Sequence, residues 1–235
     1  MMLGNKIVSD TSVSRKNLRR RLFLPHSKIQ LTGTGGTNRL AVESFVASQF
    51  FKNHQAEVSE FLPYLMSAET EKKITSAIGF RIATRQPLFL EQYLNQPVEA
   101  RLSQLRQEPV SRQAIAEIGN LASSAPGSSQ MLFVLVISVL HRAGIDWAIF
   151  TATRPVQRMI ASLGINCLDI CTAHEVQLKQ SKDSWGDYYA HQPKVIAGHL
   201  ETAYNRLCEH SVAGFMIQNY QATIDACVMQ LSREN

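Results

Sequence analysis

The chain has 235 residues and a mass of 26.3 kDa, with 45% hydrophobic and 18% charged residues. This length and composition allow a buried core and indicate a globular protein of one large domain or two small ones. The formal net charge is +5, yet residues 1–37 contribute +6 and residues 38–235 contribute −1. The body of the protein is therefore close to neutral.

The positive charge is concentrated in the segment RKNLRRR, Arg15–Arg21. Basic groups near an anionic membrane surface contribute about 1 kcal/mol each, so this segment could bind phosphates or anionic lipid. The alternative is a solvated, flexible tail, which we favour because no aromatic residues interleave with the charges. We assign residues 1–37 to this tail, with a membrane surface as its possible partner, and expect no nucleic-acid partner.

The sequence shows neither a signal peptide nor a membrane-spanning segment. The basic run is followed only by LFL and Pro25, without an apolar core or a cleavage site. The most apolar run, Met131–Leu140, has ten residues, about half of what a spanning helix needs. We therefore expect a cytoplasmic protein.

The metal-ligating residue types show no metal-binding spacing. The four cysteines lie in apolar sequence and are expected to be reduced and buried. The seven histidines form no HxxxH or HExxH motif. The sequence therefore predicts no metal site. The cysteines are Cys167, Cys171, Cys208 and Cys227.

In the first half of the chain, a hinge precedes a helix, a hairpin and two short helices. The glycines of Thr32–Asn38 lack the preceding strand and the Gly-Lys-Ser/Thr motif of a phosphate loop. Apolar spacing predicts a helix that starts at Asn38, and alternation predicts two strands around a turn at residues 67–72. Pro87 and Pro97 each open a short helix.

In the second half, strand, loop, helix, strand and helix follow one another, an order that predicts parallel strands with a right-handed crossover. Ser128 or Ser129 is the expected N-cap of the first helix, and Gly144 follows its end. The expected elements are strand 112–122, helix 128–143, strand 145–153, helix 153–163, strand 165–173, an aromatic turn at 183–189 and one closing amphipathic helix within 211–235.

The loop Ala122–Ser129 consists almost entirely of small residues and leads directly into a helix. A helix that begins there presents unpaired N–H groups and the positive end of its dipole, which together form an anion site. The diphosphate and pantetheine arm of an acyl-CoA could lie along this backbone, although the loop could also be an ordinary connection. The candidate donor-binding residues are Leu121, Ala122, Ser123, Gly127, Ser128, Ser129 and Gln130.

Glu117 is a single acid in a predicted strand of small and apolar residues. Such a carboxylate is hydrated in a cleft, raised in pKa, or paired, here with Arg81 or Arg112. In a regular strand Glu117 and Asn120 point to opposite faces, so both serve one cleft only if a bulge lies near Gly119. Glu117 and Asn120 are therefore candidate catalytic residues under that condition.

The end of the neighbouring strand carries Thr151 and Thr153, where parallel sheets place their ligands. Thr151 is the third candidate catalytic residue, whereas we expect Thr153 to cap the next helix. Trp185, Tyr188 and Tyr189 could line an acyl or acceptor pocket, or could simply close the core.

Four separated blocks occur in order between about Phe80 and Leu207: PLFLEQYL, EIGNLAS, WAIFTAT and WGDYYAHQPKVIAG. Together they resemble the thermostable haemolysin family, typified by the Vibrio delta-haemolysin. That family is similar to the acyl-homoserine-lactone autoinducer synthases and, more distantly, to the GNAT N-acyltransferases. The resemblance implies an α/β (α+β) GNAT-like fold, with a mixed central sheet flanked by helices, over residues 38–210, and leaves 211–235 as a helix packed on the domain.

The resemblance also places EIGNLAS where the autoinducer synthases carry a Trp-Glu-x-x-Arg strand. Glu117 matches their acid, whereas Asn120 replaces their arginine, which departs from the homoserine-lactone reaction. The implied activity is transfer of a fatty acyl group from acyl-CoA or an acyl carrier protein to a small-molecule amine. Glu117 would act as base, N–H groups near Leu121 would polarise the carbonyl, and Gly127–Gln130 would hold donor phosphate.

Two other hypotheses remain open at the level of sequence. The family name implies haemolysis, which predicts a membrane-active protein that uses its basic tail and exposed apolar helices to disturb bilayers. A catalytically inactive fold kept as a binding module predicts donor binding without turnover.

Overall fold

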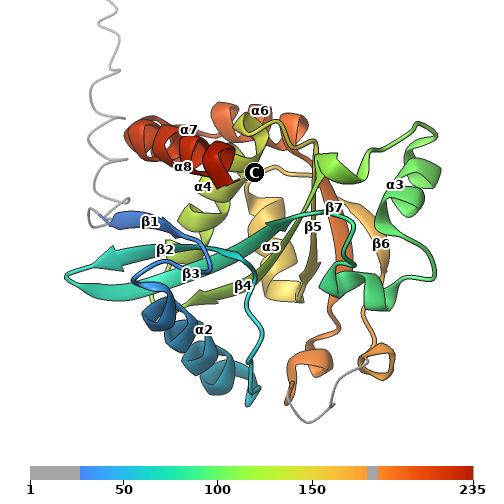
Figure 1. Cartoon of the computed structure of the whole chain (residues 1–235), viewed down its shortest axis with the longest axis horizontal. Helices are drawn as coiled ribbons and strands as arrows, with labels where there is room; N and C mark the ends of the chain where they lie inside the picture. The colour runs from blue at the N-terminus through green and yellow to red at the C-terminus, as the bar shows by residue number, and fades with distance from the viewer. Residues whose placement is uncertain (1–26, 179–184, 235) are drawn as a thin grey trace, which may run out of the picture.

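The computed structural model describes residues 27–178 and 185–234. Its centre is a seven-stranded sheet in the order β1-β2-β3-β4-β5-β7-β6 (Figure 1). All neighbouring strands are antiparallel except β4 and β5, which are parallel. The strands are β1 (Lys28–Thr32), β2 (Tyr64–Thr70), β3 (Lys73–Ile82), β4 (Ile115–Ser123), β5 (Trp147–Ala152), β6 (Leu168–Thr172) and β7 (Lys194–His199). This architecture confirms the predicted mixed central sheet.

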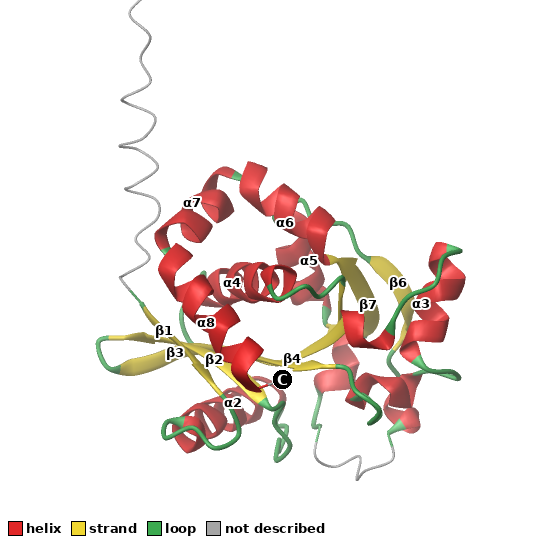
Figure 2. Ribbon diagram, turned by 45° about the horizontal axis from the view of Figure 1, so that its top comes forward, coloured by secondary structure: helices red, strands yellow, loops and turns green. Residues whose placement is uncertain are grey.

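Helices cover both faces of the sheet (Figure 2). One face carries α4, α5, α6, α7 and α8, while α2 and α3 lie against the other. The helices are α2 (Arg39–His54), α3 (Val98–Arg106), α4 (Ser128–Arg142), α5 (Arg154–Ser162), α6 (Leu200–Glu209), α7 (Ser211–Asn219) and α8 (Gln221–Glu234). Short 3-10 turns at Phe89–Tyr93, Arg112–Ala114, Glu175–Gln177 and Tyr188–His191 connect them.

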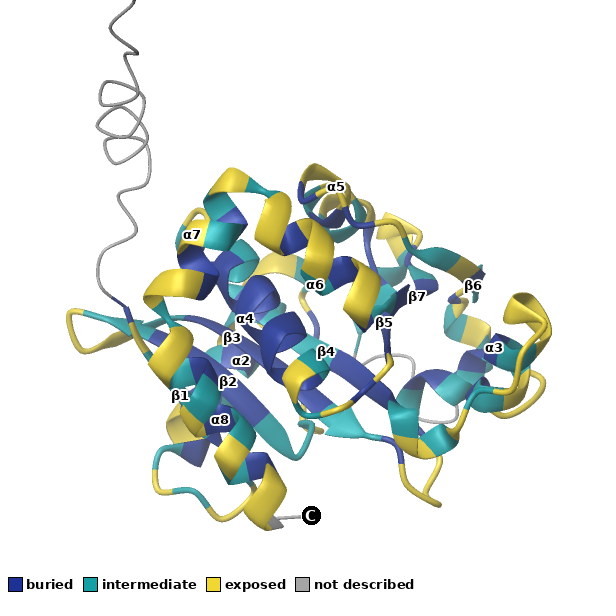
Figure 3. Ribbon diagram, turned by 90° about the horizontal axis from the view of Figure 1, so that it is seen from above, coloured by how far each residue is buried: buried dark blue, intermediate teal, exposed yellow. Residues whose placement is uncertain are grey.

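The helix α4 is the hydrophobic centre of the molecule. Every residue of its run Met131–Leu140 is buried, between the sheet on one side and α6, α7 and α8 on the other (Figure 3). A helix that is apolar all round has to be enclosed in this way. The prediction of a helix at this run is confirmed, but Gly127, with φ +78°, is its N-cap in place of Ser128 or Ser129.

Several predicted elements occur with shifted bounds. The hairpin of β2 and β3 turns at Glu71 and Lys72, which have positive φ values of 50° and 62°. The central strand β4 begins at Ile115, because Arg112–Ala114 forms a 3-10 turn and not the first residues of the strand.

The prediction missed two strands and the helix α6, and merged two helices. The edge strand β1 pairs with β2, so the sheet already begins within the segment assigned to the tail. The strand β7 was not predicted, although it pairs with both β5 and β6. The single closing helix is in fact two, α7 and α8, and both pack against α4.

Two expectations about surface and membrane features have different outcomes. The basic run Arg15–Arg21 lies outside the described residues. Within the described ranges, none of the helices has both the length and the apolarity needed to cross a membrane.

The expectation of four buried cysteines is wrong, because Cys208 is exposed and only Cys227 is fully buried.

Candidate active site

The parallel strands β4 and β5 part at their carboxyl ends. Their pairing runs from Ile115↔Trp147 to Ile118↔Phe150 and then stops. Beyond this point β4 remains paired with β3 as far as Ser123, while β5 remains paired with β7 as far as Ala152. Two strand edges that no longer pair with each other therefore face a common gap.

A bulge lies in β4 at the start of this gap. Gly79 of β3 is opposite Gly119 and Ala77 is opposite Ala122, so β4 holds one extra residue over this interval. Asn120 has a left-handed φ of +49°, a conformation that asparagine tolerates better than most residues. A bulge near Gly119 was the condition under which Glu117 and Asn120 could both face one cleft, and this condition is met, with Asn120 as the left-handed residue.

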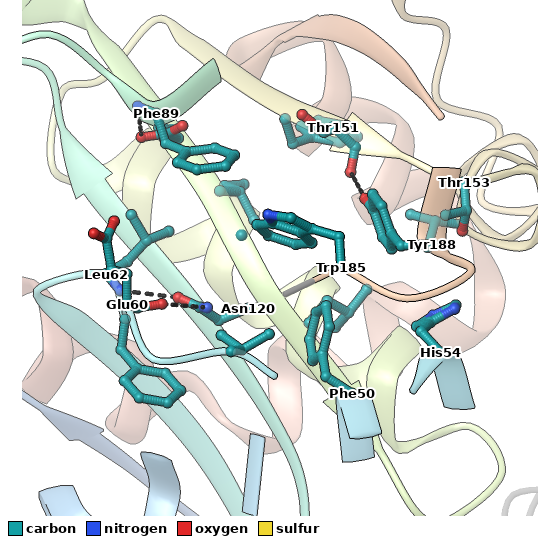
Figure 4. A pocket seen from close by; sticks show the side chains of 18 of the residues that line it. Phe50, His54, Glu60, Leu62, Phe89, Asn120, Thr151, Thr153, Trp185 and Tyr188 are labelled. Carbon is teal, nitrogen blue, oxygen red and sulfur yellow. Dashed lines mark hydrogen bonds between the residues drawn. The ribbon is translucent and has the colours of Figure 1, made fainter. Parts of the chain in front are cut away.

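The gap opens into a cavity of about 250 Å³. The cavity is lined by residues from both faces of the sheet: Ile118, Phe133 and Phe150 belong to the core beneath α4, whereas Phe89 and Tyr93 belong to the core on the opposite face. The cavity therefore passes through the sheet where β4 and β5 part, and most of its wall is apolar or aromatic (Figure 4).

The loop 57–62 forms one wall of the cavity. Arg39, itself buried, donates hydrogen bonds of 2.8 Å to the carbonyl oxygens of Leu62 and Pro63. At the bulge, Asn120 Oδ1 accepts a hydrogen bond of 2.9 Å from Leu62 N, and its Nδ2 donates to Glu60 O over 3.4 Å (Figure 4). Asn120 therefore holds this wall onto β4, which is a structural role different from the predicted catalytic one.

Aromatic side chains form the opposite wall. Trp185 and Tyr188 line the cavity with Phe89 and Tyr93, which favours the pocket alternative for the aromatic turn over simple closure of the core. The hydroxyls of Tyr93 and Tyr189 are 2.5 Å apart. Burial raises the pKa of Tyr189 to about 12 and also raises the pKa of Tyr93 and of Tyr188. These phenols are therefore neutral hydrogen-bonding groups at physiological pH.

The buried carboxylate of Glu117 lines the cavity and accepts four hydrogen bonds. Its Oε2 accepts from Arg81 Nη2 at 2.7 Å, Arg81 Nε at 3.3 Å and Phe89 N at 3.2 Å, and its Oε1 accepts from Leu90 N at 2.9 Å. Oε2 accepts three of these hydrogen bonds and Oε1 accepts one, so Oε1 keeps one acceptor position. Of the two alternatives for Glu117, this geometry favours the ion pair with Arg81 over a free general base.

Of the predicted donor-binding residues, only Leu121 lines the cavity. The hydroxyl of Ser128 is buried, donates to Ala125 O at 2.7 Å and lies 2.8 Å from the hydroxyl of Ser123. The side chains of Ser123 and Ser128 therefore stabilise the turn between β4 and α4, and neither lines the cavity. The backbone at Ala122, Gly127, Ser129 and Gln130 is outside the cavity lining as well.

The end of β5 contributes Thr151 and Thr153 to the cavity, as expected for the edge of a parallel pair. Thr153 is the N-cap residue of α5, although its side chain makes no capping hydrogen bond. The prediction missed Phe50 and His54 at the end of α2, the loop 57–62 and the deep residue Phe133. No sequence signal connects these residues, because the tertiary fold alone brings them to β4 and β5.

Two solved structures of synthases have a similar fold. FeeM, an N-acyl amino acid synthase from uncultured soil microbes, is 15% identical, with a TM-score of 0.55 over 80% of this chain and 98% of its own. BjaI, a CoA-dependent acyl-homoserine lactone synthase solved with SAM and isopentyl-CoA, is 11% identical, with a TM-score of 0.53 over 78% and 88%. These similarities confirm the predicted α/β fold with a mixed central sheet flanked by helices.

The family is shown by the sequence itself. The profile described as "Thermostable hemolysin" matches residues 33–204, more than half of the chain. The protein therefore belongs to the thermostable hemolysin family, as the four sequence blocks predicted. Among curated proteins, no sequence matches it.

Proposed function

We propose that this protein is an N-acyltransferase that moves a fatty acyl group from a thioester donor to a small-molecule amine. The observation that carries the proposal is the cavity that passes through the sheet between β4 and β5. The cavity has an apolar interior, which suits an acyl chain. At its strand edges, β4 and β5 no longer pair with each other, so main-chain N–H groups there can donate hydrogen bonds to a thioester carbonyl.

The thioester carbonyl would lie in the gap, near the backbone of Leu121, and the acyl chain would run toward Phe133 and Phe150. N–H groups aimed at the carbonyl oxygen would stabilise the negative charge that develops there. The acyl-CoA bound to BjaI supports a donor of this class, as does the N-acyl amino acid product class of FeeM. Donor phosphates would contact main-chain N–H groups at the start of α4, because the Ser123 and Ser128 hydroxyls are already used.

The acceptor would approach past the loop 57–62, which carries Glu57 and Glu60. Carboxylates at a cavity entrance raise the local concentration of cations, and amines are cationic at neutral pH. The ammonium group first loses one proton to solvent, and the neutral nitrogen then attacks the thioester carbonyl. The C–N bond forms as the C–S bond breaks, and the second proton lost by nitrogen goes to the departing thiolate.

Glu117 acts in this proposal as a positioning residue. It connects Arg81 of β3 with the main chain of Phe89 and Leu90, so it holds the aromatic wall beside the reacting atoms. We therefore replace its predicted role as base with an indirect one.

The test is release of free thiol by purified protein from panels of acyl-CoA and acyl carrier protein, with panels of amines. We expect amine-dependent thiol release in the wild type and its loss in Thr151→Phe, which fills the gap from β5. The matched control is Thr172→Phe, at the exposed end of β6 away from the cavity. Leakage from liposomes without thiol release for any pair would contradict the proposal and favour membrane activity.

A further inference from the structure

Three potential metal ligands converge beside the cavity, although they lie far apart in the sequence. His54 closes α2, while Asp187 and His191 belong to the segment that follows Trp185. One ligand atom from each residue lies within 4.8 Å of the other two. His54 and Asp187 are separated by 133 positions, so no sequence motif could reveal this cluster.

The distances between these ligand atoms suit a shared metal ion. His54 Nδ1 lies 3.3 Å from Asp187 Oδ1, and His191 Nε2 lies 4.0 Å from the same oxygen. Two atoms bound to one tetrahedral zinc ion at about 2.0–2.1 Å are roughly 3.4 Å apart. The first distance matches this separation, whereas the second is longer, so binding requires the exposed side chain of His191 to move closer.

The main chain brings the three residues together independently of their side chains. Asp187 N donates a hydrogen bond of 2.9 Å to His54 O. At Gly186 a Cβ atom would lie 1.9 Å from the same carbonyl oxygen, and the φ of Gly186 is +52°. Only glycine permits this approach. The ring of His54 also contacts the rings of Tyr188 and His191, with centroids 5.3 Å and 5.2 Å apart.

We propose that His54, Asp187 and His191 bind one divalent transition-metal ion, with zinc as the preferred ion. Two imidazole nitrogens and one carboxylate oxygen form a ligand set that zinc commonly accepts, with water in the remaining position. The set contains one negative charge and no thiolate, which disfavours calcium and copper(I) as occupants.

The consequence of binding concerns the cavity. His54, Trp185 and Tyr188 all line the cavity (Figure 4). The segment that contains Asp187 and His191 begins directly after Trp185 and includes Tyr188. A metal ion at this position connects the end of α2 to the aromatic wall. Binding would therefore fix the position of Trp185 and Tyr188, a role that does not depend on acyl transfer.

The experiment uses the full chain without a histidine tag, stripped with a chelator and titrated with Co²⁺ or Zn²⁺ alone. We expect one equivalent to bind, with the visible absorption of a cobalt site with nitrogen and oxygen ligands. Asp187→Asn and His191→Ala should each weaken binding by roughly 100-fold or more, since even outer partners of metal ligands contribute up to about that factor. The side chains of Asp187 and His191 are 57% and 45% exposed, so these variants should fold.

The matched control is His174→Ala, which removes an exposed histidine outside the cluster and should bind metal like the wild type. A second readout is the fluorescence of Trp185, which should change on Zn²⁺ binding in the wild type and not in Trp185→Phe. Absence of stoichiometric binding would overturn the proposal. So would equal affinity in the wild type, Asp187→Asn and His191→Ala, which would mean that the cluster is only a hydrogen-bonded contact.

Discussion

Arg81 of β3 and Glu117 of β4 are directly opposed in the sheet, and their side chains form an ion pair of 2.7 Å. The side chain of Glu117 is 5% exposed, whereas that of Arg81 is 29% exposed. The pair therefore joins a buried carboxylate to a partly exposed guanidinium group, and the carboxylate also accepts hydrogen bonds from the N–H groups of Phe89 and Leu90.

We expect Glu117→Ala to lower the free energy of unfolding by about 3 kcal/mol, because it leaves a partly buried arginine and two N–H groups without their acceptor. Glu117→Gln should cost less, since one acceptor oxygen remains. Urea denaturation measures both values. A cost for Glu117→Ala below about 1 kcal/mol would contradict the anchoring role.

The same pair separates an anchoring role from a catalytic base. If Glu117 positions the wall through Arg81, then Arg81→Met should lower turnover about as much as Glu117→Gln. A general base would make Glu117→Gln far more damaging than Arg81→Met, at equal stability. Thiol-release rates of the two variants, each measured with saturating donor, decide between these roles.

Asn120 offers a separate test of the bulge. Asn120→Gly keeps the left-handed conformation accessible but removes the hydrogen bond to Leu62 N, so it should cost about 1 kcal/mol. Asn120→Ala should cost about 1 kcal/mol more, because alanine pays the left-handed penalty as well. Chemical denaturation of both variants measures the difference. Equal stability of the two would show that position 120 is not left-handed in solution.

Stability at acidic pH should depend on Glu91. Burial alone would raise its pKa, but hydrogen bonds from Arg112 and from the N–H groups of Val98 and Leu88 lower it from 4.5 to about 2. Between pH 2 and pH 4.5, Glu91 binds a proton more readily in the unfolded chain than in the folded protein. The contribution of the Glu91 carboxylate to the free energy of unfolding is therefore complete above about pH 4.5 and is lost as pH falls toward 2. Glu91→Gln should flatten the pH dependence of the free energy of unfolding in that window. An unchanged pH dependence in Glu91→Gln would contradict this role of Glu91.

The four thiols should differ in reactivity. Burial raises the pKa of Cys167 and of Cys227 to about 11, so neither is a thiolate near pH 8. Cys208 is exposed, and we expect it to react first with a thiol reagent in the folded protein. The check is the time course of labelling in the wild type and in Cys208→Ser, which should lack the fast phase. A fast phase that persists in Cys208→Ser would refute this order.

The features that could be predicted from sequence are those with a local signal. The helix α4 could be predicted because its apolar run is too long for a strand, whereas the bulge near Gly119 could be stated only as a condition for Glu117 and Asn120 to face one cleft. The strand β1 was missed because KIQLT is short and adjoins the basic segment. The boundary at Tyr220 was missed because apolar spacing continues through it, while the Tyr220 hydroxyl donates to Ser27 O at 3.2 Å in the fold.

The site could be predicted on the two strands β4 and β5 and, as one of two alternatives, on the aromatic turn with Trp185 and Tyr188. Glu117, Leu121 and Thr151 line the cavity because parallel strands end at the same edge. The wall residues come from segments on other elements, so their approach depends on how α2, the loop 57–62 and residues 185–188 pack. The serines of the loop after β4 were misleading because a turn can use such hydroxyls to close itself.

The short parallel pairing of β4 with β5 has a mechanical consequence. The sheet has two antiparallel parts, one formed by β1, β2, β3 and β4 and the other by β5, β7 and β6. Within the sheet, four residue pairs between β4 and β5 join the two parts. Because β4 and β5 are paired at one end only, this pairing can act as a hinge. A ligand that widens the unpaired end would rotate one part of the sheet relative to the other. We therefore expect a bulky ligand to change the angle between the two parts of the sheet.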